Sequence, residues 1–322
     1  MKKAFIISFC LISTSTFSQS SAPDSTWQIT REMIITNSGK PASEAIADLF
    51  SRLESNSGPG VSVNRDEFLK YLDLPESKIV YSKQLIKYAT PLSREIQKKE
   101  HEDFTKIFMN EKRLNNGVDF IKQHYDLLSQ AEEKYGVKIK DLVSILMWES
   151  GLGEFTGSYQ VFNIFVGQIL FLDEAQKYAI AELEKKGETN PLDDTAFAAK
   201  EKRRLDYRKK DAANSLVALL RYCKKYDMDP LKQTGSWGGA IGYVQFMPYN
   251  FQYIIDGDSD GNKDLFSWPD AVMSAANFLK TYGKYSTSAK KRWQAIYRYN
   301  TSDEYVNGVI LYADEIWKRF KN

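Results

Sequence analysis

Apolar residues recur at the spacing of an α-helix along most of this chain, and that periodicity constrains its fold more than any other feature. Alternating runs of apolar and polar residues, the pattern of a half-buried strand, are scarce. We therefore predict a mainly α-helical protein, with loops at residues 58–60 and 236–242, where glycines gather. The segments with the helical period are residues 45–53, 68–72, 117–135, 142–147, 212–226, 271–282 and 306–320.

The first eighteen residues have the pattern of a secretory signal peptide. Two lysines precede an apolar run over residues 4–12, which is too short for the roughly 20 apolar residues of a membrane-spanning helix. We expect cleavage after Ser18, a periplasmic mature protein and no transmembrane segment in it. Cys10 follows Phe9 inside the apolar run, whereas a lipoprotein signal has a small residue before its cysteine. This disfavours lipidation, and leaves open whether the mature protein is free or tethered at a membrane.

Residue counts argue against several classes of site. Once the signal is removed Cys223 is the only cysteine, so no intramolecular disulfide can form. Against 42 acidic residues stand 44 basic ones, and a net charge of +2 argues against a dedicated nucleic-acid surface. The only two histidines, His101 and His124, leave little room for a His-rich metal site or a Ser-His-Asp triad.

A stretch dense in charge occupies residues 185–210. It also contains Gly187, Asn190 and Pro191, so we expect a partly helical insertion that leaves the core. Both a solvated surface insertion and a segment that grips substrate would have this composition.

A carboxyl group stands where an apolar residue is expected. Leu142, Ile145, Leu146 and Glu149 fall on one stripe of a predicted helix. Two glycines follow at positions 151 and 153, so the helix should end there, with the negative end of its dipole at Glu149. That dipole and burial would both raise the pKa of Glu149, as a proton donor near neutral pH requires. From the helix alone, a Glu paired with a buried Arg or Lys is the favoured interpretation, and further evidence is needed to overturn it.

A second motif, at residues 235–248, has four glycines within eight positions. Such a backbone either turns sharply or approaches a ligand closely. Ser236 and Gln245 supply polar side chains beside aromatic ones, a combination that grips sugars through hydrogen bonds and ring stacking. A glycine-rich loop is a weak signal alone, but it gains weight beside Glu149.

Several motifs, taken in order, resemble the lytic murein transglycosylase B family from about residue 104 to the C-terminus. They are Trp148-Glu149-Ser150-Gly151-Leu152-Gly153, Gly157, Asn163, residues 235–248 and Tyr297-Arg298-Tyr299-Asn300. The resemblance implies a lysozyme-like helical catalytic domain at residues 104–322, preceded by a helical accessory region at residues 19–103. It implies that Glu149 is the catalytic acid. The positions implied to contact or line the substrate site are Ser236, Tyr243, Gln245, Tyr299, Asn300 and Tyr305.

A hydrolytic glycosidase normally uses two carboxylates, yet only Glu149 stands in a recognisable catalytic motif. As the resemblance implies, Glu149 would protonate the oxygen between N-acetylmuramic acid and N-acetylglucosamine in peptidoglycan. It would then deprotonate the muramyl C6 hydroxyl, which closes a 1,6-anhydro ring. The substrate thus supplies its own nucleophile, which is why one carboxylate can be enough. The expected partner is the peptidoglycan glycan strand.

An acidic loop resembles the calcium loop of an EF-hand. Asp256, Asp258 and Asp260 occupy loop positions one, three and five, glycine follows at six, and Asn262 offers a backbone oxygen at seven. Position twelve is serine instead of glutamate, and Asp270 aligns with the residue that closes the longer loop of the resembled family. We expect structural Ca²⁺ here in preference to an acidic turn, and no organic cofactor.

The chain departs from the family at an arginine pair that follows the catalytic helix. Glu174 and Ala175 align there, and Phe278 replaces a family tyrosine. The substituted arginine pair keeps open a peptidoglycan-binding or scaffold protein with weak catalysis. A separate alternative is a hydrolytic muramidase, which would require a second carboxylate able to activate water.

Overall fold

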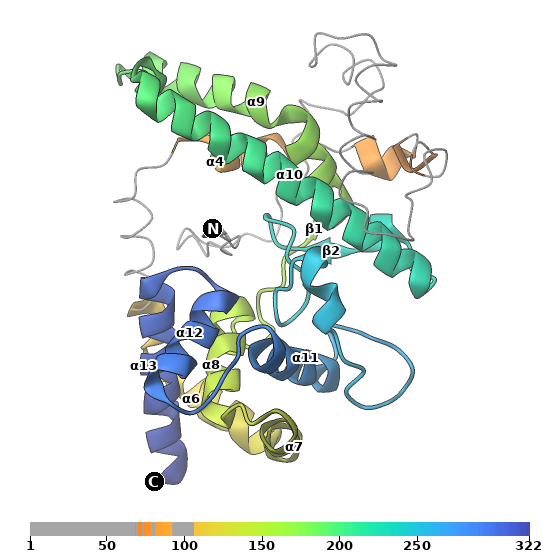
Figure 1. The fold of residues 1–322 in the computed structure, drawn as a ribbon, viewed down its shortest axis with the longest axis vertical. Coiled ribbons are helices and arrows are strands. Elements are labelled where there is room, and N and C mark those ends of the chain that lie inside the picture. The colour runs from red at the N-terminus through yellow and green to blue at the C-terminus, as the bar shows by residue number, and fades with distance from the viewer. Residues whose placement is uncertain (1–67, 69, 73, 79–80, 92–105) are drawn as a thin grey trace.

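The computed structural model describes residues 68, 70–72, 74–78, 81–91 and 106–322. The predicted signal peptide at residues 1–18, Cys10, and most of the region at 19–103, including the segments 45–53 and 58–60, lie outside the described residues. The described part is mainly helical, which confirms the mainly α prediction (Figure 1). The bounds of its α-helices are α4 Ser82–Ala89, α6 Glu111–Gln123, α7 Tyr125–Tyr135, α8 Ile139–Ser150, α9 Val161–Lys185, α10 Thr195–Lys225, α11 Trp268–Thr281, α12 Ala289–Tyr299 and α13 Asp303–Lys321.

The short elements are 3-10 helices and two strands of two residues. The 3-10 helices are η1 Pro75–Lys78, η2 Pro191–Asp193, η3 Pro230–Lys232 and η4 Pro248–Tyr253, and the strands are β1 Tyr159–Gln160 and β2 Thr234–Gly235. None of the described helices combines the length and the apolar character that a membrane crossing requires.

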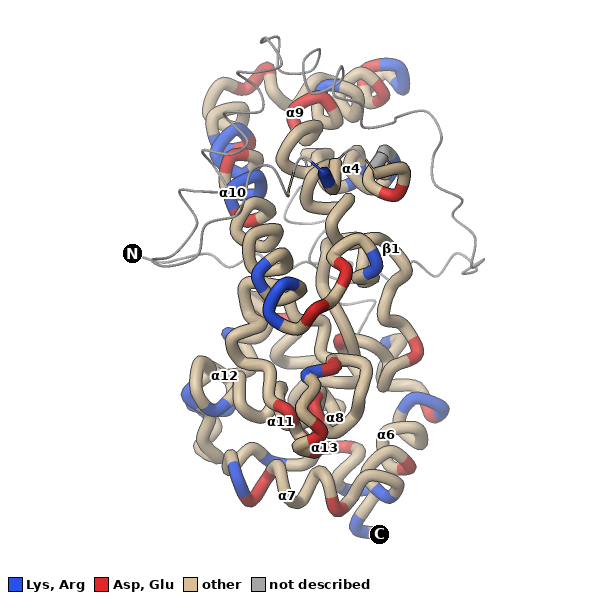
Figure 2. Tube along the Cα trace, turned by 90° about the vertical axis from the view of Figure 1, so that its right-hand side faces the viewer, with Lys and Arg blue, Asp and Glu red and all other residues tan. Residues whose placement is uncertain are grey.

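The described helices form two layers joined by the strands and loops (Figure 1). In one layer α9 and α10 form a long hairpin, and α4 packs on α9. In the other layer α8 is surrounded by α6, α7, α11 and α13, and α12 packs beside α13. Lys and Arg are interspersed with Asp and Glu along α10 (Figure 2). Glu149 lies on α8 and therefore belongs to this second layer.

Helix α8 is the centre of the core. Every residue from Ile139 to Ser150 is buried except Lys140. The helix ends at Ser150 because Gly151 adopts a left-handed conformation with φ of 60°, where its N–H donates to the carbonyl of Met147 at 2.8 Å. The predicted helix end just after Glu149 is confirmed.

The observed helices differ in several places from those that the apolar spacing predicts. The predicted segment 117–135 is two helices, α6 and α7, which meet at His124. Helices α4, α9 and α12 were not among the predicted segments. The first nine residues of α9 are all buried, and a helix that is buried on every side has no exposed polar face to give an amphipathic period. Residues 185–210 form the tip of the hairpin between α9 and α10. Whether they are an insertion stays a prediction.

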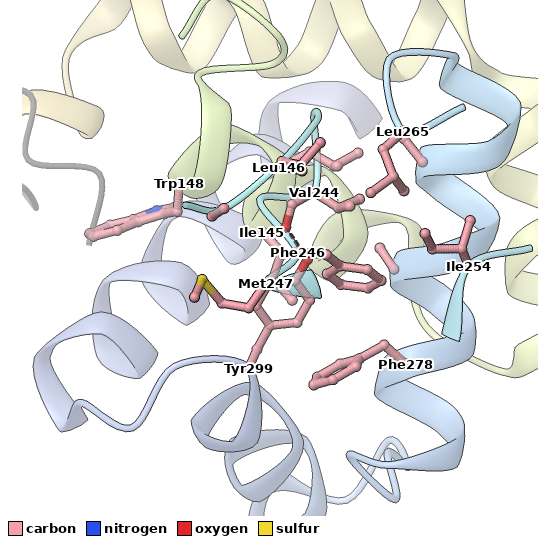
Figure 3. Close-up of a cluster of buried hydrophobic side chains, with 14 of the residues drawn as sticks. Ile145, Leu146, Trp148, Val244, Phe246, Met247, Ile254, Leu265, Phe278 and Tyr299 are labelled. Atoms are coloured by element: carbon pink, nitrogen blue, oxygen red, sulfur yellow. Dashed lines mark hydrogen bonds between the residues drawn. The ribbon is translucent and has the colours of Figure 1, made fainter. Parts of the chain in front are cut away.

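A two-stranded antiparallel sheet brings the segment after α8 to the glycine-rich loop. Tyr159 pairs with Gly235, and a Cβ on Gly157 would lie 2.1 Å from the carbonyl oxygen of Gly235, so only glycine fits there. Further along the loop, Ile241 and Phe246 exchange backbone hydrogen bonds of 2.9 and 3.1 Å. The loop predicted at 236–242 is confirmed. Figure 3 shows the core beneath it, where side chains of the loop meet those of α8 and α11.

Candidate active site

Glu149 is buried in the last turn of α8, with 8% of its surface exposed. The Tyr305 hydroxyl donates a hydrogen bond of 2.6 Å to its Oε1 atom. No described Lys or Arg forms an ion pair with it, which excludes pairing with a buried cation within the described part of the chain. Burial raises the pKa of Glu149 from 4.5 to about 8, although the bond from Tyr305 lowers it in part. The group is therefore an isolated acid that stays protonated at neutral pH.

Two buried tyrosines approach Glu149 from the C-terminal helices. Tyr305 lies in the first turn of α13, which Ser302 caps, and its ring contacts Trp148 edge-on at 5.7 Å between centroids. Tyr299 ends α12, and its hydroxyl donates to the carbonyl of Val244 at 2.7 Å. Burial and then the Glu149 carboxylate raise the pKa of both tyrosines, so both hydroxyls remain protonated donors.

The glycine-rich loop is fastened to the end of α8. The Ser150 hydroxyl donates to the carbonyl of Tyr243 at 2.7 Å and accepts the N–H of Gly153 at 3.1 Å. The amide of Gln245 donates to the carbonyls of Gly242 and Thr156, at 2.8 and 3.3 Å. Ser150 was not predicted as a site residue, although it follows Glu149 directly. The two motifs are one structural unit.

The predicted substrate residues thus have polar groups engaged within the protein. The Ser236 hydroxyl accepts the N–H of Ala240 at 3.1 Å and closes the loop's first turn. Asn300 is buried at the end of α12, where its N–H donates to the carbonyl of Ile296 at 3.1 Å. Tyr299 and Tyr305 contact the loop and Glu149 as described above. Their roles toward substrate stay predictions.

Tyr243 packs against the turn that follows Glu149. Its ring stacks on Trp268 at 4.0 Å between centroids, and a Cβ on Gly153 would lie 3.0 Å from it. A cavity of about 460 Å³ adjoins this turn, lined by Gly151, Leu152, Gly153 and Glu154, and by Asn116, Asp119, Phe120 and Gln123 of α6. The turn after the buried acid therefore faces solvent-accessible space.

The acidic loop gathers three of its five predicted ligands. Oxygens of Asp256, Asp258 and Asp260 lie within 4.8 Å of one another. The side chain of Asn262 donates to Asp260 at 3.2 Å, which leaves its backbone oxygen, the predicted ligand, as a prediction. Asp270 is buried at the start of α11, and its two oxygens accept the N–H groups of Gly257 and Asp264, each at 2.6 Å. Three carboxylates this close, in an EF-hand spacing, fit a hard cation such as Ca²⁺.

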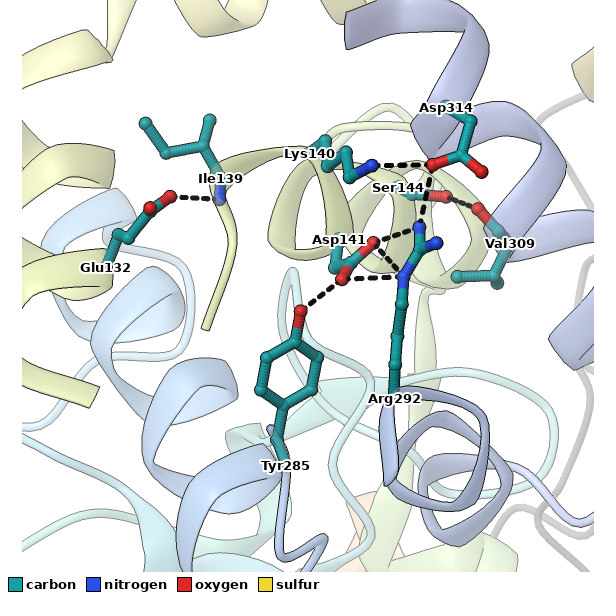
Figure 4. Close-up of polar contacts among 9 residues, drawn as sticks. All are labelled: Glu132, Ile139, Lys140, Asp141, Ser144, Tyr285, Arg292, Val309 and Asp314. Carbon is teal, nitrogen blue, oxygen red and sulfur yellow. Dashed lines mark hydrogen bonds and ion pairs between the residues drawn. The ribbon is translucent and has the colours of Figure 1, made fainter. Parts of the chain in front are cut away.

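The opposite end of α8 carries a second buried carboxyl that the sequence did not reveal. Asp141 is fully buried, and Arg292 binds both of its oxygens at 2.6 to 3.0 Å while the Tyr285 hydroxyl donates to one of them (Figure 4). Arg292 also bonds to Asp314, which pairs with Lys140. A cavity of about 360 Å³ opens beside this network. No local pattern signals it, because 151 residues separate Asp141 from Arg292.

Residues 70–292 match the family model described as the transglycosylase SLT domain. This chain belongs to that family. The match includes Glu149, the glycine-rich loop and the acidic loop, but ends before α13, the helix of Tyr305.

Known transglycosylases resemble the chain in sequence and in fold. The membrane-bound lytic murein transglycosylase B of Escherichia coli K12 is 29% identical over 181 residues, which are 56% of this chain and 41% of that protein. The chain thus spans about two fifths of the relative that it matches. The E. coli lytic transglycosylase Slt35, solved in complex with calcium, has a TM-score of 0.61 at 17% identity, covering 86% of this chain and 94% of its own.

A third comparison agrees in fold. The soluble lytic transglycosylase SltB1 of Pseudomonas aeruginosa has a TM-score of 0.63 at 21% identity, covering 86% of this chain and 99% of its own. The predicted fold class of this SLT-domain protein, a lysozyme-like helical core, is confirmed by these two structures.

Proposed function

We propose that this protein is a lytic transglycosylase that cleaves the β-1,4 bond between N-acetylmuramic acid and N-acetylglucosamine in peptidoglycan. The observation that carries the proposal is Glu149, a buried carboxyl with a pKa of about 8 and no cation paired with it among the described residues. A carboxyl that is protonated at neutral pH can donate its proton to a glycosidic oxygen. Membership in the transglycosylase family and the names of the relatives support the same reaction.

The reaction balances with one protein group. Glu149 gives its proton to the glycosidic oxygen as the bond from that oxygen to the muramyl C1 breaks, which releases N-acetylglucosamine with a free hydroxyl. The muramyl C6 oxygen then bonds to C1, and its proton returns to Glu149. A 1,6-anhydro ring forms, water is not consumed, and Glu149 ends protonated. A pKa near the working pH suits a group that must serve as acid and then as base.

The absence of a second suitable carboxyl among the described residues favours this reaction over hydrolysis. Glu154 is exposed and paired with Arg113, and Asp173 is paired with Lys209. No described acid acts on the pKa of Glu149. An inverting or retaining hydrolase would need a carboxylate across the bond from the acid, to activate water or to attack C1.

The walls of the site would position the sugar. Tyr305 holds Glu149 in place through its hydroxyl, and Ser150 and Gln245 fix the loop against the end of α8. Tyr243, half-buried beside the open turn, would contact a sugar ring, with Ser236, Tyr299 and Asn300 shaping the loop and the helix end behind it. The relatives are described as murein enzymes, which supports a glycan strand as the substrate.

Calcium at the acidic loop is part of the proposal. Asp256, Asp258 and Asp260 would hold the ion, the backbone carbonyl of Asn262 would complete the loop's set, and Asp270 would close the loop onto α11. The bound ion would neutralise three carboxylates and make the loop rigid. A fold relative solved with calcium supports this assignment. The proposed peptidoglycan substrate and the predicted signal peptide support a periplasmic location for the mature protein.

Digestion of purified sacculi, followed by mass spectrometry of the released muropeptides, tests the proposal. We expect anhydro-muramyl ends, lighter than hydrolytic ends by one water, and a loss of about a thousandfold in rate for Glu149→Gln. Glu133→Gln, an exposed glutamate of α7 that does not line the cavity beside this turn, is the matched control and should leave the rate unchanged. Reducing muramyl ends would establish a muramidase instead, and binding of sacculi without release would establish a peptidoglycan-binding or scaffold protein.

A further inference from the structure

The first turn of the glycine-rich loop, residues 236–240, is held by a side chain of α4. The amide of Gln84 donates a hydrogen bond of 2.5 Å to the carbonyl of Trp237, which lies 153 residues further along the chain. Within the turn, the N–H of Gly239 donates to the carbonyl of Ser236 at 2.9 Å. No other described residue donates to the carbonyl of Trp237. Gln84 is therefore the side chain that anchors this turn from outside.

The surroundings of Gln84 show that it does more than fill the core. Its side chain is buried, with 7% of the residue exposed, and its Oε1 atom has no hydrogen-bond partner among the described residues. A buried amide with one atom unpaired costs free energy that an apolar side chain of similar size would avoid. Packing of α4 alone therefore gives no reason for a glutamine here, whereas the bond to the loop does.

Helix α4 is itself fixed to the hairpin of α9 and α10. It packs along α9, and two arginines of α10 bind the carbonyls at its C-terminal end, which have no partner within the helix. Arg204 donates to the carbonyls of Tyr88 and Ala89 at 3.2 and 2.9 Å, and Arg208 donates to that of Tyr88 at 2.9 Å. Both arginines belong to the charged stretch at residues 185–210. This stretch thus holds the helix that holds the loop.

The glycine-rich loop is fixed at two places, on α4 and on α8. The ring of Trp237 contacts α4, because the ring of Tyr88 meets it edge-on at 5.6 Å between centroids and the Lys87 ammonium lies 5.7 Å from its centroid. Towards the other end of the loop, the Ser150 hydroxyl of α8 donates to the carbonyl of Tyr243 at 2.7 Å. A change at α4 can therefore reach the part of the loop that borders the active site.

We propose that Gln84 is a positioning residue for the reaction: it fixes the loop so that Tyr243 and Gln245 meet the sugar in one arrangement. This inference rests on the proposed function, which assigns the substrate to that loop. Because Gln84 acts through the backbone of the loop, its loss should weaken glycan binding and leave proton transfer by Glu149 intact. Part of the region at residues 19–103 would then belong to the catalytic unit.

Steady-state kinetics on soluble, uncrosslinked peptidoglycan strands, with anhydro ends counted by mass spectrometry, tests this role. Gln84→Met keeps the size of the side chain and removes the donor. It should raise KM by about tenfold and change kcat by less than about twofold, because binding is weakened equally in the ground state and the transition state. Thr90→Val is the matched control. It removes a 2.7 Å bond to the carbonyl of Ile86 at the end of α4 without touching the loop, and should leave KM unchanged.

Amide hydrogen exchange measures the loop without turnover. Residues 236–240 should exchange faster in Gln84→Met than in wild type, whereas α8 should keep its protection, because only the turn loses an anchor. Melting curves establish that the variants are folded. If Gln84→Met does not fold, Gln84→Asn takes its place with the same expectations, because its amide is one methylene shorter and does not reach the carbonyl of Trp237.

The outcomes separate this inference from the proposed function. An unchanged KM for Gln84→Met, or an equal rise for Thr90→Val, overturns the positioning role, because Gln84 then only stabilises α4. A lowered kcat at unchanged KM overturns it as well. Anhydro products formed at the wild-type KM refute this inference and leave the proposed function standing. If the wild type releases no product, the proposed function fails, and hydrogen exchange decides alone: faster exchange at residues 236–240 supports the anchor, and equal exchange overturns it.

Discussion

Each end of α8 buries one carboxyl, and the two carboxyls have opposite surroundings. At the N-terminal end, Asp141 has Arg292 across both oxygens and a tyrosine hydroxyl as well. At the C-terminal end, Glu149 has one tyrosine hydroxyl and no cation among the described residues. The helix dipole adds to the difference, because it favours negative charge at the N-terminus and disfavours it at the C-terminus.

Burial alone does not make a carboxyl group a catalytic acid. A buried carboxyl with a guanidinium partner anchors the core, since its charge is matched where it stands. A buried carboxyl without one keeps its proton, as the raised pKa of Glu149 shows. The arrangement at Asp141 also holds α8 in register with α12, which fixes where Glu149 lies at the other end.

The largest predicted effect is a pH dependence of the folding stability, caused by Glu149. Because the pKa of Glu149 is raised in the folded state, this group contributes stability that is fully present below its unfolded pKa of 4.5. That contribution is lost as pH rises through about 8. Glu149→Gln removes that titration. Relative to wild type the variant should gain on the order of 4 kcal/mol between pH 5 and pH 8. Urea unfolding at both pH values measures this, and parallel curves for the two proteins would contradict it.

Breaking the pair at the other end should destabilise the protein at neutral pH. Arg292→Met leaves Asp141 buried without its cation, so we expect a loss of about 3 kcal/mol in the free energy of unfolding. Lys140→Met removes a cation that pairs with the exposed Asp314, and should cost less than about 1 kcal/mol. Denaturant titrations of both variants compare them, and equal losses would show that the Asp141 pair has no special weight.

Removing the one partner of Glu149 should raise its pKa further. Tyr305→Phe deletes a hydrogen bond that stabilises the carboxylate, so the alkaline limb of the pH–rate profile should move to higher pH. The rate below that limb should fall by about tenfold or less, since the acid itself remains. A limb that moves to lower pH would mean that Tyr305 does not stabilise the charged form.

The smallest predicted effect concerns the carboxyls of the acidic loop, which gather on the surface with no Lys or Arg paired to them among the described residues. Added Ca²⁺ should raise the melting temperature by a few degrees and a chelator should reverse this, because an ion that binds only the folded state stabilises it. Asp258→Asn should weaken the response, whereas Asp303→Asn, outside the loop, should not. A melting temperature indifferent to both additions would leave the loop as an acidic turn.

The sequence revealed Glu149 and its helix end because the signals are local: an apolar stripe, a misplaced carboxyl and two glycines within twelve residues. It did not reveal Arg292 as the partner of Asp141, because packing of α12 on the core decides that contact. Helix α9 escaped detection because the start of the helix is buried on all sides and has no exposed polar face. Tyr305 was identified only by family resemblance as a substrate contact, and its bond to Glu149, 156 residues away, needed the fold.

The most direct test of the account is the titration of the Glu149 carboxyl itself. Carbon-13 NMR of protein labelled at the glutamate side-chain carboxyl can assign this resonance as the one that Glu149→Gln lacks. The account predicts a midpoint near pH 8, with the group protonated at neutral pH. A midpoint near the ordinary value of 4.5 would show that Glu149 is charged at neutral pH, and would contradict its role as the acid.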